Sequence, residues 1–284
     1  MFAIIGVFVV LGCVVGGFML EGGQVGILIQ PVELLIIGGS AVGSFLISAP
    51  KTLIIDTVKS LMKVFTGKEM GKADFMEILS AMYELMTLLR SGGPVAIDQH
   101  VNKPEASSVI GKYKALAHHK DLLHFLCDNF KVLLAGNIEP HQFDAMMNID
   151  IATKHHHGVM PSQAVNKISD SMPGLGIVAA VLGIVITMGK INEPPEILGK
   201  SIGAALVGTF LGILMCYGFF GPMATNLEHQ ANEHNAALKA IKAGMSNYAA
   251  GVAPIVAVEA ARRAIPGHAQ PSFEELEEGM RSVK

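Results

Sequence analysis

The sequence predicts an all-α integral membrane protein: two transmembrane helices, a large helical cytoplasmic insertion, two further transmembrane helices and a helical C-terminal tail. Hydrophobic residues make up 51% of the 284 residues, charged residues only 16%, and the mean hydropathy is +0.46. This composition is too apolar for an ordinary soluble enzyme. A helix needs roughly 20 apolar residues to cross a bilayer. Four stretches of about this length contain no acidic, basic or histidine side chain: residues 2–20, 34–50, 171–189 and 201–227.

The four stretches form two close pairs, which favours membrane spans over buried core helices for each of them. Lys and Arg are enriched on the cytoplasmic side of membrane proteins. Residues 1–50 contain neither, whereas the segment 51–172 contains thirteen, beginning with Lys51. We therefore expect this segment and both termini to be cytoplasmic, with short external turns at residues 21–33 and 190–200.

The chain has no internal repeat, and one integrated domain is the simplest account of it. After the fourth span, the polar stretch 228–242 is typical of a helix that continues into the cytoplasm. The tail then closes with a small helix, because Ser272 and Glu275 fit a capping box. The expected regions are two transmembrane helices, a cytoplasmic helical region, two transmembrane helices and cytoplasmic C-terminal helices, at residues 1–50, 51–170, 171–227 and 228–284.

Small residues recur four apart in the fourth span and the turn before it. Gly199 pairs with Gly203, and Gly208 pairs with Gly212. This spacing packs membrane helices through backbone contact. Packing within one chain and packing between subunits both explain the pattern.

A cytoplasmic amphipathic helix is expected before a tight corner at residues 90–94 (RSGGP). Its apolar side chains recur at helical spacing: Phe75, Ile78, Leu79, Met82, Leu85, Met86 and Leu89. The glycines permit a left-handed helix end, and Pro94 suits the first turn of the next helix. Arg90 and Asp98 flank the corner as opposite charges. A solvated pair of this kind contributes about 0–1 kcal/mol, so the residues alone favour a surface role.

No pattern in the sequence indicates enzyme chemistry, a cofactor or a metal. Residues 155–157 are three consecutive histidines, but neighbours on a helix point about 100° apart and do not converge on one ion. His118 and His119 fail for the same reason. The three cysteines give no disulfide framework or metal spacing. The net charge of −3 gives no basic footprint for nucleic acid.

Proton carriers usually hold a carboxylate or histidine within the bilayer, and the four predicted spans have none. If the chain conducts an ion, the titrating carboxylate must come from another polypeptide. The spans instead offer Thr187, Thr209 and Tyr217, which could hydrogen-bond water or a guest carboxylate. Pro173 opens the third span and Pro222 lies near the end of the fourth. Each proline marks either a mobile helix end beside an ion path or an ordinary helix end, and the residues alone favour an ordinary helix end.

Several motifs of the chain resemble the MotA/PomA family of flagellar stator proteins, and the likeness runs nearly end to end. The loop between the first two spans carries Gly22-Gly23, Gln30-Pro31 and Glu33-Leu34 in the family arrangement. The other motifs are residues 171–180 (SMPGLGIVAA), 207–212 (VGTFLG), Tyr217-Gly218, Pro222 and 271–278 (PSFEELEE). The two-plus-two spans and the large insertion also match.

This resemblance implies a bacterial inner-membrane torque generator, in which five copies of the chain surround two copies of MotB. A single membrane helix of MotB would supply the missing aspartate, and torque would pass to the rotor protein FliG. By the same resemblance, Arg90 and the acid near the corner meet FliG, while Pro173 and Pro222 couple ion flow to movement. The acid here is Asp98, where close relatives carry Glu, so its contact is less secure than that of Arg90.

The resemblance also bears on the ion. Sodium-driven relatives place a Thr in the third span where this chain has Ala179 and Ala180. A partly hydrated ion benefits from an oxygen ligand there and a proton does not, so we predict proton coupling. The alternatives are a sodium-driven stator, an ExbB/TolQ-type energiser with fewer spans, a solute carrier, which should show inverted repeats, and a structural scaffold.

Overall fold

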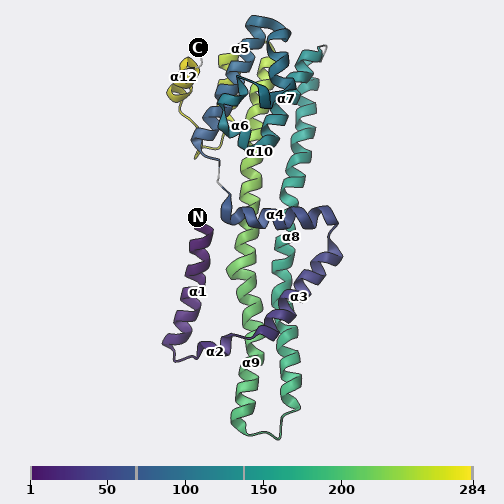
Figure 1. The fold of residues 1–284 in the computed structure, drawn as a ribbon, viewed down its shortest axis with the longest axis vertical. Helices are drawn as coiled ribbons and strands as arrows, with labels where there is room; N and C mark the ends of the chain where they lie inside the picture. The colour runs from purple at the N-terminus through teal and green to yellow at the C-terminus, as the bar shows by residue number, and fades with distance from the viewer. Residues whose placement is uncertain (1, 68–69, 137, 283–284) are drawn as a thin grey trace. The chain divides into compact units, whose positions relative to one another are not determined.

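The computed structural model consists of helices and connecting turns, and it describes residues 2–67, 70–136 and 138–282 (Figure 1). Met1 and Lys284, which bound the first and last predicted regions, lie outside the described residues. Within the described ranges no β-strand occurs. The predicted all-α class is confirmed.

Contacts divide the chain into two compact units, each built from two separate segments of the sequence. The membrane unit comprises residues 1–67 and 157–229, and the second unit comprises residues 68–156 and 230–284. The sequence predicted one integrated domain, whereas the structure has two compact units. The reason is that the insertion and the tail pack into a hydrophobic core of their own.

The membrane unit holds the helices that can cross a bilayer. Its elements include α1 (Phe2–Leu20), α2 (Val25–Leu28), α3 (Pro31–Ser48), α4 (Lys51–Thr66), α9 (Pro195–Leu214) and parts of α8 (Pro140–Met188) and α10 (Gly221–Ala249). A π-helical segment, Met215–Phe220, joins α9 to α10 without a break. Four helical segments are long and apolar enough to span: Phe2–Leu20, Val25–Ser48, Pro140–Met188 and Pro195–Ala249. The predicted number of spans is confirmed.

Two spanning helices begin earlier than the sequence suggested. α3 begins at Pro31 and α9 at Pro195, because proline suits the first helical turn, where its missing N–H costs no hydrogen bond. Each helix therefore includes charged residues near its start. In α3 this residue is Glu33, and in α9 the residues are Glu196 and Lys200.

Glycines bring α8 and α9 into backbone contact. A Cβ atom placed on Gly212 would lie 2.5 Å from the carbonyl oxygen of Met172 and 2.9 Å from Cα of Gly176. A Cβ atom on Gly176 would lie 2.8 Å from the carbonyl oxygen of Gly208. The Gly208 and Gly212 pair thus packs within the chain, whereas a Cβ atom on Gly199 or Gly203 would meet nothing within 4 Å.

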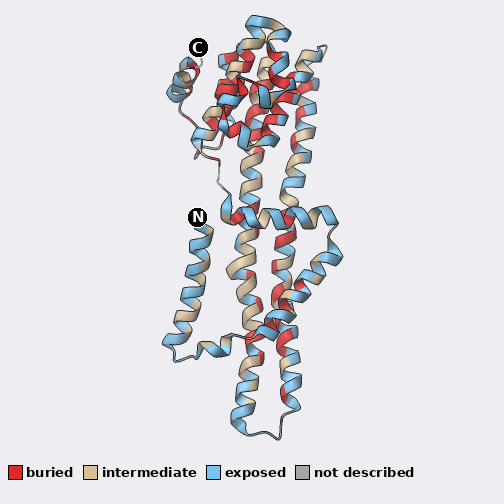
Figure 2. Cartoon of the chain, viewed as in Figure 1, coloured by how far each residue is buried: buried red, intermediate tan, exposed pale blue. Residues whose placement is uncertain are grey.

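The second unit is a helical bundle around aromatic and aliphatic side chains. Its helices are α5 (Lys72–Asn102), α6 (Lys114–His118), α7 (Lys120–Ala135), α11 (Pro254–Arg263), α12 (Phe273–Ser282) and the remaining parts of α8 and α10. Figure 2 shows buried residues gathered where these helices meet. The largest fully buried side chains include Phe125, Phe130, Phe143, Met82 and Leu85. The predicted apolar stripe of α5 contributes to this core.

The predicted corner lies inside α5, where two helical arms meet at Gly93. Gly93 has φ 69° and ψ −171°, a left-handed conformation that side-chain-bearing residues rarely adopt. Pro94 follows as the first residue of the second arm. The left-handed glycine expected from the sequence is confirmed, and it places Arg90 before the bend and Asp98 after it.

Local hydrogen bonds fix the start of α12 and its connection to α11 within the second unit. The backbone N–H of Glu275 donates to Ser272 Oγ (3.2 Å), and the N–H of Ser272 donates to Glu275 Oε2 (2.6 Å), so the predicted capping box is confirmed. Arg262 donates to the carbonyl oxygen of Pro271 (2.9 Å). Hydrogen bonds from Arg262 and Arg263 lower the pKa of the Glu259 carboxyl group to about 2. Glu259 is therefore ionised at neutral pH and holds the Arg262 side chain in place.

A matched glycine pair on α9 tests the backbone contact. Gly212→Ala is expected to destabilise the protein by about 1–3 kcal/mol, because the new methyl group meets rigid backbone of α8. Gly203→Ala adds the same methyl group where no atom lies within 4 Å and is expected to leave stability unchanged or slightly higher. Thermal unfolding of the purified protein in detergent measures both. Equal stability of the two variants would contradict the contact.

Candidate functional site

The predicted lining residues all lie in the membrane unit, on α8 and on the continuous helix that follows the turn. Pro173, Ala180 and Thr187 belong to α8, Thr209 to α9, Tyr217 to the π-helical segment and Pro222 to α10. Ala180 and Thr187 are buried within the chain, whereas Tyr217 is 74% exposed and Pro222 is exposed. The residues therefore share one helix pair but not one surface.

Neither proline marks a helix end, which corrects the interpretation that the residues alone favoured. Pro173 lies inside the uninterrupted helix α8. Its ring removes the N–H that would bond the carbonyl oxygen of Ser169 four residues earlier. Pro222 is the second residue of α10 and follows the π-helical segment directly. There the backbone N–H of Gly221 donates to the carbonyl oxygen of Cys216, five residues earlier, because the extra residue of a π turn accommodates the proline.

Ser169 joins the two irregular helix regions. Its hydroxyl group is buried and donates to the carbonyl oxygen of Cys216 (3.0 Å), which is the same oxygen that accepts the Gly221 N–H. The residue that loses a helical hydrogen bond because of Pro173 thus holds the turn that precedes Pro222. Sequence reasoning missed Ser169. Its position four residues before a proline within a helix is a signal that could have indicated it.

Polar groups near the Tyr217 and Pro222 end of the predicted lining surround a hollow on α8, the π-helical segment and α10. Tyr217 and Pro222 border it, together with Ser169, Asp170 and His229. Asp170 is exposed and accepts a hydrogen bond from the side chain of Asn166 (3.3 Å). This is the place where the structure brings two predicted residues, Tyr217 and Pro222, to one polar surface.

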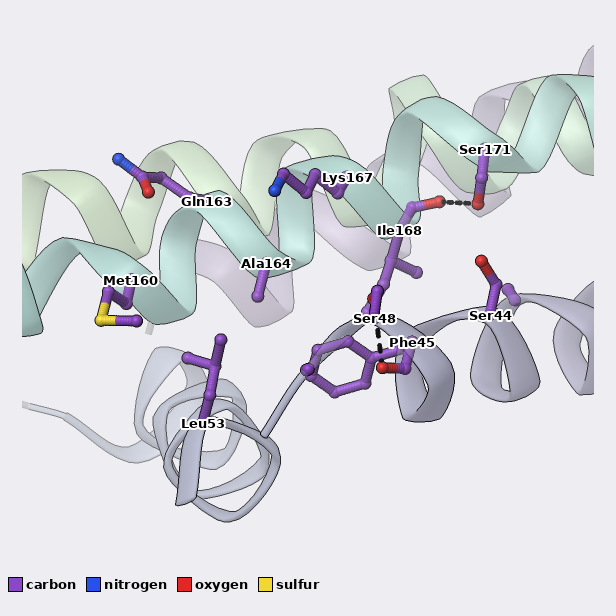
Figure 3. Close-up of a pocket in the computed structure, with 12 residues that line it drawn as sticks. Ser44, Phe45, Ser48, Leu53, Met160, Gln163, Ala164, Lys167, Ile168 and Ser171 are labelled. Atoms are coloured by element: carbon purple, nitrogen blue, oxygen red, sulfur yellow. Dashed lines mark hydrogen bonds between the residues drawn. The ribbon is translucent and has the colours of Figure 1, made fainter. Parts of the chain in front are cut away.

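A second hollow lies between α8 and the α3–α4 connection (Figure 3). Two of the three serine hydroxyl groups that line it bond their own helices: Ser171 donates to the carbonyl oxygen of Ile168 (2.7 Å) and Ser48 to that of Phe45 (3.2 Å). Lys167 is the charged residue among those that line it. The hollow is therefore mainly a packing gap and not an assembled ion site.

The hydroxyl group of Thr187 is also used within its own helix. It donates to the carbonyl oxygen of Gly183 (2.8 Å). Thr187 can therefore accept a hydrogen bond from a guest group but does not donate to one in this arrangement. Ala180 lies in the α8–α9 contact, since its backbone nitrogen is 3.1 Å from the position a Cβ atom on Gly208 would take.

The predicted span of residues 34–50 has no titratable side chain, but α3 begins earlier, at Pro31, and includes one. Glu33, assigned from the sequence to an external turn, lies in the first turn of this helix and is only 8% exposed. Its Oε2 atom is 2.8 Å from the position of a Cβ atom on Gly208, so the carboxyl group enters the α8–α9 contact. Pro31 at the start of α3 is the signal that could have placed Glu33 within a helix.

Arg90 and Asp98 are both exposed in the second unit, and the ion pairs of the described chain do not include one between them. Asp98 instead accepts a hydrogen bond from the Asn102 side chain (2.9 Å). Arg90 borders two hollows, one with Tyr248 and Val252 and one with Pro254. The opposite-charge pair predicted at the corner is therefore two separate surface charges.

No group of three His, Cys, Asp or Glu side chains among residues 2–67, 70–136 and 138–282 could hold a metal ion. Cys127 is buried in the second unit, and burial raises the pKa of its thiol to about 12. Such a thiol is inert at neutral pH.

Comparison with known proteins identifies the family. The model of the Motility protein A N-terminal region matches residues 4–93, and that of the MotA/TolQ/ExbB proton channel family matches residues 117–240. Motility protein A of Escherichia coli (strain K12) is 35% identical over 100% of this chain and 96% of its own length. Chemotaxis protein LafT of Vibrio parahaemolyticus is 31% identical over 96% of both.

Solved structures agree on the fold. C. jejuni MotAB matches with a TM-score of 0.78 and 20% identity, over 95% of this chain and 98% of the other. The flagellar MotAB stator complex of Bacillus subtilis matches with a TM-score of 0.73 and 20% identity, over 90% and 92%. With four apolar helices and these relatives, the chain is a multi-pass membrane protein. Because full-length relatives exceed 30% identity and two family models cover most of the sequence, the chain belongs to the Motility protein A family of the MotA/TolQ/ExbB proton channel proteins.

Proposed function

We propose that the chain is the ion-conducting subunit of a bacterial flagellar stator, which couples proton flow to rotation in complex with a MotB-like partner. The proposal is supported by the motility names of the full-length relatives and by the stator complexes with the same fold. The observation that carries it is the neutrality of the lining. Among the described residues of α8 from 171 and of α9 from 201 through the π-helical segment, no acidic or basic side chain occurs.

A neutral lining requires a titrating group from elsewhere. In the proposed complex, five copies of this chain surround two partner helices, each with a membrane aspartate. Protonation removes the charge of that aspartate and changes its contacts with α8 and α9. Pro173 and the π-helical segment before Pro222 are the deformable points, since both interrupt regular helical hydrogen bonds. Ser169 would couple their movements through its bond to Cys216.

The proposed orientation places both termini and the second unit in the cytoplasm. It is supported by the absence of Lys and Arg from residues 1–50 and their abundance in the segment 51–172. Movement of the lining would then pass along α8 and α10, which contribute residues to both units. An ExbB/TolQ-type energiser is the second candidate, since the channel family model includes those proteins. The match of residues 4–93 to the Motility protein A N-terminal model and the four spans favour the stator.

Proton flux into vesicles tests the function. The chain co-reconstituted with its single-span partner, free of any plug segment, is expected to carry protons, as measured with a pH-sensitive dye. Replacing the partner's membrane aspartate by asparagine should reduce the flux to that of empty vesicles, because the lining has no substitute group facing the partner. Vesicles that contain the chain alone are expected to show no proton flux above that of empty vesicles. Flux from the chain alone would refute the proposal.

Sodium removal tests the choice of ion. Cells that depend on this stator are expected to keep their swimming speed when external sodium is replaced at constant proton-motive force. The physical reason is that Ala179 and Ala180 offer no side-chain oxygen to a partly hydrated cation. Tracking single cells measures the speed, and loss of motility would show sodium coupling instead.

Charge reversal tests the rotor contact. Arg90→Glu is expected to lower motor torque several-fold, because attraction to an acidic site on FliG becomes repulsion. A reciprocal acid-to-base change on FliG should restore it. Lys239→Glu, an exposed reversal on α10, is the matched control and should leave torque unchanged. Bead assays on tethered flagella measure torque. An unchanged torque in Arg90→Glu cells would show that Arg90 is an ordinary surface charge that does not contact the rotor.

A further inference from the structure

Glu33 is a buried carboxyl group that the proposed ion path does not use. It lies in the first turn of α3, a helix that can span the membrane, and it is only 8% exposed. Its Oε2 atom has no hydrogen-bond partner in the described chain. The α3 N-terminus does not satisfy it either, although unpaired amides at a helix start often bind carboxylates.

Two glycines create the space that the Glu33 carboxyl group fills. Oε2 is 2.8 Å from the position of a Cβ atom on Gly208 of α9, and Oε1 is 3.5 Å from that on Gly183 of α8. Ala205 closes the same gap on its other side, where its Cβ atom is 2.7 Å from the Gly183 position. Any larger side chain at Gly208 would displace the carboxyl group. The group therefore acts as a wedge that attaches α3 to the α8–α9 pair.

The surroundings favour the neutral form of this wedge. The residues that meet it on α8 and α9 are glycines and alanines, and the ion pairs of the described chain include none with Glu33. Within the membrane unit, the titratable residues of the neighbouring helices are His157, Lys167 and Asp170 on α8 and Glu196 and Lys200 on α9; all five are exposed. α2 has no titratable residue. Burial of an ionised carboxylate without a partner is strongly unfavourable, and protonation of the carboxyl group avoids this cost.

We propose that Glu33 is a proton-binding site within the membrane, whose neutral carboxyl group fills the gap at Gly183 and Gly208 and thereby holds α3 against α8 and α9. Deprotonation would leave a buried negative charge and expel the side chain from the gap. Under the proposed orientation, on which this step rests, Glu33 lies toward the external side. The packing of the lining then weakens as the external pH rises.

Infrared spectroscopy tests the proton directly, without any motor. The chain with its partner in nanodiscs at neutral pH should show a protonated-carboxyl band that disappears in Glu33→Gln. It should also disappear as the pH is raised. Glu21→Gln, an exposed acid in the turn between α1 and α2, is the matched control and should leave this band unchanged. Identical spectra of the wild type and Glu33→Gln would overturn the proposal.

Motility then tests the wedge. Glu33→Gln keeps the shape of the neutral acid and should swim at about the wild-type speed near neutral pH, whereas Glu33→Ala, which empties the gap, should swim slowly. As external pH rises at constant driving force, wild-type speed should fall relative to that of Glu33→Gln. If cells with Glu33→Gln swim as slowly as cells with Glu33→Ala, the proposal that a neutral carboxyl group fills the gap is wrong. If the wild-type chain supports no motility at all, the stator function fails while the infrared result stands.

Discussion

The backbone contact between α8 and α9 constrains the rest of the membrane unit. Gly176, Gly208 and Gly212 let the two helices approach so closely that a single added methyl group would meet main-chain atoms. In a bilayer, where lipid is as apolar as the side chains, such packing is a main source of helix association. The rigid pair fixes where Ala180 and Thr209 lie, and it also forms the gap that receives Glu33.

Several hydroxyl groups in this unit donate to nearby backbone carbonyl oxygens. Thr187 and Ser171 bond their own helix, while Ser169 bonds the next one at Cys216. Among the hydroxyl groups of the predicted lining, that of Thr187 is therefore occupied, whereas those of Thr209 and Tyr217 make no hydrogen bond to the described residues. In the proposed stator, ion coupling by a neutral lining would depend on a carboxylate from the partner and on helices that can deform. Both interruptions of helical hydrogen bonding meet at Ser169. Pro173 removes the N–H that would bond the Ser169 carbonyl oxygen, and the Ser169 hydroxyl group donates to Cys216 in the turn before Pro222.

Features set by local sequence were predictable, and features set by packing were not. The four spans, the left-handed Gly93 and the Ser272–Glu275 capping box follow from residues adjacent in sequence. The continuity of α8 through Pro173 was not predictable, because a proline in a helical pattern is compatible with either a helix end or an uninterrupted helix. Glu33 was misplaced because a charge beside turn residues is typical of a loop. Its burial depends on Gly208, 175 positions away in the chain, so no local pattern indicates it.

The most direct test of this account is an experimental structure of the chain with its single-span partner in lipid, at a resolution that shows side chains. The account predicts that α8 and α9 meet at Gly176 and Gly212 in every copy, with the Glu33 carboxyl group between Gly183 and Gly208 and the partner against other surfaces of the pair. A partner helix seated on these glycines, with α8 and α9 apart and Glu33 facing water, would contradict it.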